Sequence, residues 1–188
     1  MKRWETMRQN KKIYIIISQT GTILSRILKL ITGKTYNHAS ISLDRELDEM
    51  YSFGRLNPYN PFWGGFVHES IHYGTFKRFH NTESLILQID IDDKEFEKLR
   101  DIIYSIDNNK KFYKYNTAGL ILCAIHIPYH RDRSYYCSEF VKDMLVQTSI
   151  IDSKDLPIMI HPMDFLSIPH NNVYQGKLRD YTYKTKVI

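Results

Sequence analysis

The sequence has little cysteine and no long hydrophobic run. Cys123 and Cys137 are the two cysteines in 188 residues, which is too few for a disulfide framework. The longest apolar runs, residues 13–17 and 118–127, are too short to span a bilayer as helices. The charged N-terminus has no apolar segment of the kind that a secretory signal carries. These absences argue against a disulfide-stapled scaffold and a membrane-spanning chain, and they predict a cytoplasmic protein with free thiols.

Sequence motifs for nucleic-acid binding, repeats and metal sites are also missing. The formal net charge is +5, but acidic and basic residues are mixed along the chain, so we expect no nucleic-acid partner. His68, His72 and His80 lack the spacing of a known metal site, and we expect neither a metal nor a cofactor. Because no internal repeat is present, residues 1–188 fit one domain with one core. Residues 1–11 are expected to form a peripheral extension.

Strand-like and helix-like patterns are mixed without a repeating βαβ unit. β-Branched and aromatic runs or alternating apolar positions are typical of strands, and apolar residues three to four apart are typical of helices. We expect strands over residues 13–17, 36–43, 49–53, 84–91 and 172–176, and helices over residues 23–31, 93–107 and 137–147. Residues 62–67 fit a strand or a loop over a groove, and residues 117–127 form an apolar segment in which Cys123 is expected to be buried and unreactive. The mixture predicts an α+β fold with an antiparallel sheet packed against helices.

The predicted helix over residues 23–31 is amphipathic and carries basic residues. Arg26 and Lys29 lie around its later turns. A basic amphipathic helix is able to lie on a membrane surface. Packing of its apolar face against a core, with the basic face in water, is commoner, so membrane contact is the less favoured interpretation.

The chain offers one thiol and one imidazole in positions suited to nucleophilic chemistry. Cys137 stands at the predicted start of a helix, where unpaired backbone N–H groups and the helix dipole favour a thiolate. His38 begins the polar face of the strand over residues 36–43. If the following turn is centred near Arg45, Ser52 becomes the cross-strand neighbour of His38. A buried structural thiol and a structural histidine would fit the same positions.

Two motifs carry a family resemblance. The sequence Asn37-His38-Ala39-Ser40-Ile41, followed far downstream by Tyr136-Cys137-Ser138-Glu139-Phe140-Val141, resembles the permuted papain-like amidases of the YiiX/YebB type, relatives of the NlpC-like cysteine peptidases. In this group the histidine strand precedes the cysteine helix, as it does here. The resemblance spans about residues 13–181 and implies a circularly permuted papain-like (NlpC-like) fold.

The resemblance also implies roles for individual residues. Cys137 would be the nucleophile and His38 the general base and acid. The residue that orients the imidazole varies in such families, and Ser52 is our choice for it. Tyr136, Glu139 and Tyr51 are further candidates for substrate contacts, with capping of the helix start as the preferred alternative for Glu139.

The activity that the resemblance implies is cysteine hydrolysis of an amide or peptide bond through a thioester. The backbone N–H of Cys137 is the expected oxyanion donor, and a small peptide, amide or acyl compound is the expected substrate. Two alternatives stay open. One is a lipid or thioester acyl hydrolase or acyltransferase resembling lecithin retinol acyltransferase. The other is a catalytically inactive binding module on the same fold.

Overall fold

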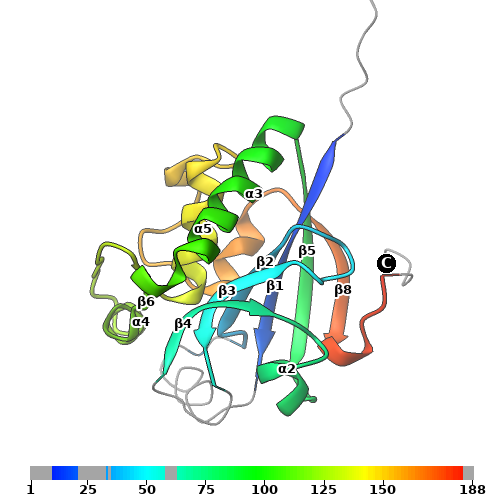
Figure 1. Cartoon of the computed structure of the whole chain (residues 1–188), viewed down its shortest axis with the longest axis horizontal. Coiled ribbons are helices and arrows are strands. Elements are labelled where there is room, and N and C mark those ends of the chain that lie inside the picture. The colour runs from blue at the N-terminus through cyan, green and yellow to red at the C-terminus, as the bar shows by residue number, and fades with distance from the viewer. Residues whose placement is uncertain (1–9, 21–32, 34, 58–62, 184–188) are drawn as a thin grey trace, which may run out of the picture.

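The computed structural model describes residues 10–20, 33, 35–57 and 63–183 (Figure 1). The chain combines strands with α-helices and short 3₁₀ helices. The strands are β1 (Lys11–Gln19), β2 (His38–Ser42), β3 (Met50–Arg55), β4 (Gly64–Glu69), β5 (Glu83–Ile91), β6 (Lys114–Tyr115), β7 (Ser134–Tyr135) and β8 (Asn171–Lys177). The α-helices are α2 (Gly74–Arg78), α3 (Asp93–Asn108), α4 (Thr117–Ala124) and α5 (Cys137–Gln147). The 3₁₀ helices are η1 (Lys110–Phe112), η2 (Ser153–Asp155), η3 (Pro162–Ser167) and η4 (Leu178–Asp180).

Within the described residues, the main sheet has six strands in the order β4-β3-β2-β1-β5-β8. Every neighbouring pair in it is antiparallel. The short strands β6 and β7 pair with each other in parallel, directly before α4 and α5. These elements confirm the α+β class and the expected antiparallel sheet.

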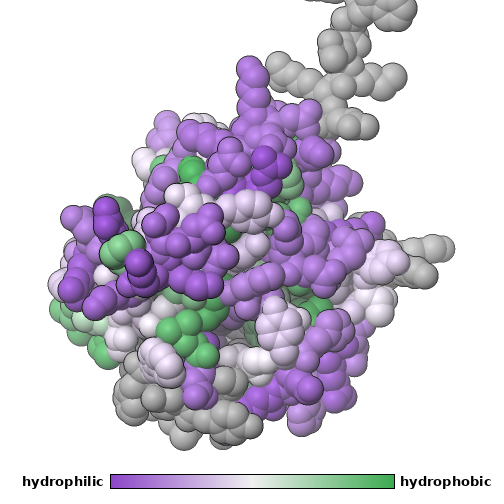
Figure 2. All heavy atoms as spheres, viewed as in Figure 1, coloured by the Kyte–Doolittle hydropathy of each residue, from purple (hydrophilic) through white to green (hydrophobic). Residues whose placement is uncertain are grey.

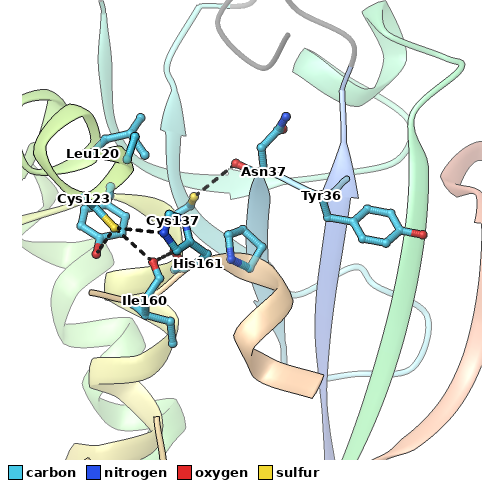
Figure 3. Close-up of a pocket in the computed structure, with 11 residues that line it drawn as sticks. Tyr36, Asn37, Leu120, Cys123, Cys137, Ile160 and His161 are labelled. Carbon is cyan, nitrogen blue, oxygen red and sulfur yellow. Dashed lines mark hydrogen bonds between the residues drawn. The ribbon is translucent and has the colours of Figure 1, made fainter. Parts of the chain in front are cut away.

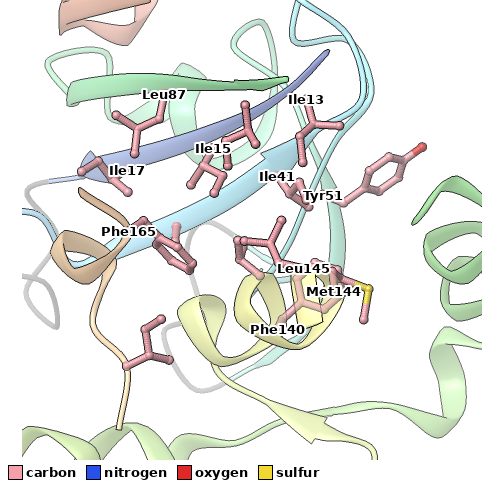
Figure 4. Packing of buried hydrophobic residues seen from close by; sticks show 14 of the residues in the cluster. Ile13, Ile15, Ile17, Ile41, Tyr51, Leu87, Phe140, Met144, Leu145 and Phe165 are labelled. Carbon is pink, nitrogen blue, oxygen red and sulfur yellow. The ribbon is translucent and has the colours of Figure 1, made fainter. Parts of the chain in front are cut away.

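Strand β1 lies inside the sheet, between β2 and β5, and its side chains are buried on both faces of the sheet. Ile13, Ile15 and Ile17 face the main core, while Tyr14 and Ile16 face a smaller cluster on the other side. A continuous run of β-branched and aromatic residues is what such a two-sided strand requires. Figure 4 shows the main core between β1 and the apolar side of α5.

The first residues of helix α5 lie next to the start of β2. Its apolar side, which includes Phe140, Met144 and Leu145, is fully buried in the main core. Helix α3 lies beside α5 (Figure 1) and begins with a capping box, in which Asp92 accepts from the Glu95 backbone N–H and Glu95 accepts from the Asp92 backbone N–H. Packing of α5 against β2 and β3 therefore fixes where Cys137 lies relative to the histidine strand.

The turn between β2 and β3 is longer than the sequence pattern indicated. The Asp44 carboxylate accepts from the backbone N–H groups of Asp48 and Glu49, and the Leu43 N–H donates to the Glu49 carbonyl. Ile41 consequently pairs with Tyr51. The prediction that Ser52 lies opposite His38 is therefore wrong by two residues, because the connection is two residues longer than expected and every antiparallel partner shifts by the same two positions.

Lys11, which we placed in the peripheral extension, is the first residue of β1 and pairs with Ile91, so this boundary is corrected. The predicted helix over residues 23–31 lies outside the described residues. In the ranges that the structure does describe, no helix is both long and apolar enough to cross a membrane.

Candidate active site

Cys137 is the first residue of α5 and lies in a small cavity. Its side chain is 2% exposed, and its thiol contacts the Asn37 carbonyl oxygen at 3.9 Å (Figure 3). The first residue of a helix has a backbone N–H without an intrahelical acceptor. The cavity has a free volume of about 20 Å³, which is room for about one water molecule. The thiol is thus held tightly, next to backbone donors that suit an anion.

His38 lies between this thiol and a carboxylate. Its Nε2 is 2.9 Å from Glu69 Oε1 and 3.2 Å from Glu69 Oε2. The Ser40 hydroxyl donates to the same carboxylate, so Glu69 is held from two sides. The side chains of His38 and Glu69 are only 15% and 9% exposed, and a pair so shielded from water interacts strongly. Strands β2 and β4 thus supply an imidazole with a fixed carboxylate partner.

The protonation of His38 reflects these neighbours. Burial by itself would lower the pKa of His38, but the Glu69 carboxylate and a hydrogen bond with the Cys137 side chain outweigh burial and raise the pKa to about 10. The imidazole is therefore protonated at neutral pH in this arrangement. A cation between a thiol and a carboxylate is the arrangement that stabilises a thiolate.

Ser52 does not take the orienting place that we expected for it. Its hydroxyl is buried and donates to the Ala39 carbonyl at 2.7 Å. Glu69 makes the contact with the imidazole instead. Gly54 is the residue of β3 next to the ring, because a Cβ built on it would lie 3.6 Å from His38 Cε1. The side chain that contacts the imidazole is therefore Glu69, which the sequence patterns did not single out, and not Ser52.

The three residues predicted to contact substrate have different surroundings. Tyr51 is buried in the main core, where its ring stacks on His68 with 4.8 Å between the ring centroids, so this geometry gives no support to its predicted role. Tyr136 lines the cavity of Cys137. Glu139 Oε2 accepts from the Tyr136 backbone N–H at 3.3 Å, which fits the capping role. Its other oxygen lies 3.0 Å from His130 Nδ1.

A second thiol lines the same cavity. Cys123 is 3% exposed, as expected for a buried thiol, and its sulfur lies 3.8 Å from His161 Nε2 and 3.8 Å from the Ile160 carbonyl oxygen (Figure 3). The Tyr136 hydroxyl donates to the Cys123 sulfur at 3.5 Å. The sequence patterns predicted a short helical turn at residues 161–165 but did not place His161 at the cavity, because 38 positions separate it from Cys123.

Tyr115 is another residue near the thiol that sequence patterns did not indicate. Burial raises the pKa of Tyr115, and the nearby charge of Cys137 raises it further, while Arg55 acts in the opposite direction. Gly64 leaves room for this ring, since a Cβ there would lie 2.8 Å from the Tyr115 Cβ. Tyr115 therefore stays neutral and adds a polar group to the surroundings of Cys137.

In the described ranges, no group of three or more His, Cys, Asp and Glu side chains is arranged to hold a metal ion. Comparison of the chain with protein-family models, with curated proteins and with solved structures finds no match. The geometry around Cys137 and His38 is therefore the basis on which a function can be assigned.

Proposed function

We propose that this protein is a cysteine hydrolase on a circularly permuted papain-like fold, which cleaves an amide or peptide bond through a thioester. The observation that carries the proposal is the position of His38, bonded to Glu69 through Nε2 and close enough to Cys137 for that side chain to raise the pKa of the imidazole. Because Nε2 faces the carboxylate, Nδ1 is the nitrogen available to the sulfur. The order of histidine strand and cysteine helix, β2 before α5, supports the permuted fold.

In the proposed reaction, the Cys137 thiolate attacks the carbonyl carbon of the substrate. A carbon–sulfur bond forms, and the carbonyl electron pair moves to oxygen, where the backbone N–H of Cys137 donates to it. The His38 imidazolium gives its proton to the leaving nitrogen as the carbon–nitrogen bond breaks. Water then attacks the thioester, His38 accepts a proton from it, and the acyl group leaves as a carboxylic acid while the thiol is restored.

Glu69 acts on this reaction through the imidazole. Its carboxylate fixes the ring orientation and favours the charged imidazolium, as the acidic member of a catalytic triad does. Ser40, which lies on the same strand as His38, donates to Glu69 and supports it. We therefore assign Glu69 as a positioning residue and Cys137 and His38 as the residues that touch the reacting atoms.

The experiment that tests this function is covalent labelling with a panel of thiol-reactive amide, ester and acyl-lipid probes, followed by peptide mapping. We expect the label on Cys137, and we expect His38→Ala to abolish labelling by the amide probes, because the thiolate loses its cationic partner. The buried position of Cys137 predicts faster labelling by small probes such as iodoacetamide than by bulky ones. Preferential labelling of Cys123, or undiminished labelling in His38→Ala, would contradict the proposal.

One observation favours a second candidate, an acyl-lipid or thioester hydrolase or acyltransferase. A larger cavity of about 310 Å³ adjoins the site and shares Cys123 and Tyr136 with it. Ile127, Ile158 and Met159 are among its lining residues, and such a lining suits an aliphatic chain. Faster reaction with long-chain acyl probes than with peptide probes would favour this candidate over amide hydrolysis.

A further inference from the structure

The connection after α4 is unusual in its exposure and composition. All nine residues of the segment 125–133 are exposed. Its first five residues, Ile-His-Ile-Pro-Tyr, are mainly apolar, and its last four, His-Arg-Asp-Arg, are mainly charged. The backbone has positive φ at both His126 and Arg133, which non-glycine residues adopt at some cost. The segment thus holds large apolar side chains in water on a defined turn.

More apolar side chains surround this segment. Ile121 lies on α4, and Ile125 is the C-cap residue one helical turn later, so the two side chains lie on the same side of the helix end, and both are exposed. Ile127, Tyr129 and Ile158 line one cavity together, and the Ile158 side chain is 86% exposed. We call these five residues the α4 rim. Figure 2 shows apolar residues at the edge of the molecule over α4, next to hydrophilic ones.

Two basic residues come shortly after Tyr129, a residue of the α4 rim, in the chain. Arg131 and Arg133 are both exposed. In the part of the chain that the structure describes, neither guanidinium forms an ion pair with a carboxylate. Asp132 is the one acidic residue between Ile125 and Arg133. We call Arg131 and Arg133 the arginine collar. Their positive charge, beside the apolar side chains of the α4 rim, is complementary to an anionic surface that has an apolar layer beneath it.

We propose that the α4 rim and its arginine collar dock this protein onto an anionic lipid bilayer. The isoleucine side chains enter the boundary between headgroups and acyl chains, Tyr129 lies at headgroup level, and Arg131 and Arg133 pair with lipid phosphates. A second copy of this chain fits the surface less well, because two copies joined through it would bring like-charged arginines together. The proposal does not depend on the chemistry of Cys137.

The docked position would have a consequence for substrate entry. The cavity at the α4 rim shares Cys123 and Tyr136 with the cavity that holds Cys137. The bilayer would therefore cover the mouth of a cavity that adjoins the nucleophile. A substrate carried in the membrane would reach this side of the molecule first.

Co-sedimentation of the full chain with vesicles tests the proposal. We expect binding to vesicles of phosphatidylcholine mixed with phosphatidylglycerol, weaker binding as salt is added, and little binding to phosphatidylcholine alone. Ile125→Asp and Ile158→Asp should each lower the partition coefficient about tenfold or more. Arg131→Gln with Arg133→Gln should lower it about fivefold for each charge removed.

Tyr73→Asp is the matched control. Tyr73 and Ile125 are each 53% exposed, but Tyr73 lies at the start of α2, away from the rim. The Tyr73→Asp variant should bind vesicles as the wild type does. Circular dichroism checks that each variant is folded, and because the Ile158 side chain is 86% exposed, we expect Ile158→Asp to fold as the wild type does.

Three results would overturn the proposal. The first is wild-type protein that stays in the supernatant with anionic vesicles at low salt. The second is unchanged binding by the folded Ile125→Asp and Ile158→Asp variants. The third is a dimer, detected by analytical ultracentrifugation, that these substitutions dissociate while vesicle binding is absent, because the rim would then be an interface between copies of this chain.

Discussion

The chain contains two thiols that each lie near an imidazole, and they line the same cavity. Cys137 begins α5, whereas Cys123 is the next-to-last residue of α4. The positive end of a helix dipole favours a thiolate at the first position, and the negative end disfavours one at the second. The pair of Cys137 and His38 also has the Glu69 carboxylate behind its imidazole. Position on the helix and the support of the imidazole therefore distinguish the two thiols, although burial does not.

The surroundings of Cys123 are those of a structural thiol. Its sulfur accepts from the Tyr136 hydroxyl and lies against the Ile160 carbonyl. The backbone N–H of its neighbour His161 donates to the Asp164 carboxylate at 2.8 Å, which caps η3. These contacts connect α4, α5 and η3. We infer that Cys123 stabilises the wall of the cavity that holds Cys137.

Replacement of each thiol separately gives the largest expected difference. Cys137→Ala should lower kcat/KM on the order of 10⁴-fold or more, because the nucleophile is removed. Cys123→Ala should stay within about tenfold of the wild type, since only packing and a weak hydrogen bond are lost. Steady-state kinetics on the best substrate from the probe panel measures both. Equal losses in the two variants would break the distinction between a reactive and a structural thiol.

Glu69→Gln tests the support of the imidazole. Loss of the carboxylate should lower kcat/KM about 10²- to 10⁴-fold, by analogy with the acidic member of a triad, and NMR titration should show that the pKa of His38 falls from about 10. His161→Gln should leave that pKa unchanged. An unaltered His38 titration in Glu69→Gln would remove Glu69 from the site.

Ser52→Ala is the control for the corrected residue. The Ser52 hydroxyl donates to the Ala39 carbonyl inside the sheet, so its loss should lower the free energy of unfolding by about 1 kcal/mol and leave kcat/KM within about threefold of the wild type. Chemical denaturation and the same kinetic assay separate the two effects. A large loss of kcat/KM in a variant with unchanged stability would restore our original assignment of Ser52.

The pH dependence of stability gives the effect that is most specific to His38. The pKa of His38 rises from its ordinary value of 6.5 to about 10 in the folded protein, so the folded state holds its proton more tightly than the unfolded state does. The stabilisation from this group should be fully present below pH 6.5 and should be lost as the pH rises through about 10. Urea denaturation over this window, in the wild type and in Glu69→Gln, measures it. A similar decline with rising pH in both proteins would show that another group is responsible.

Local patterns in the sequence predicted most of the secondary structure. The β-branched run at Ile13–Ile17 is in β1, the alternating residues after Asn37 form β2, and the Asp92 cap begins α3. These predictions succeed because periodicity and capping are properties of neighbouring residues. The same patterns placed Cys137 at a helix start, where the structure has it.

Such local patterns could not predict the contacts between strands that are far apart in the sequence. Register depends on turn length, and the Asp44 side chain lengthens the turn after β2 by bonding the backbone of Asp48 and Glu49. Glu69 reaches His38 only because β4 pairs with β3 and β3 with β2. Nothing in the 31 positions that separate His38 from Glu69 marks that carboxylate as its partner.

The sequence by itself determined the class of the fold, the thiol at the start of a helix and the histidine at the start of a strand, because each is written in a few adjacent residues. Only the tertiary structure decided that Glu69 supports His38, that Cys123 and Cys137 line one cavity, and that the segment 125–133 is exposed throughout. These features arise where strands and helices far apart in the chain pack together, and the register and burial that create them are properties of the whole core.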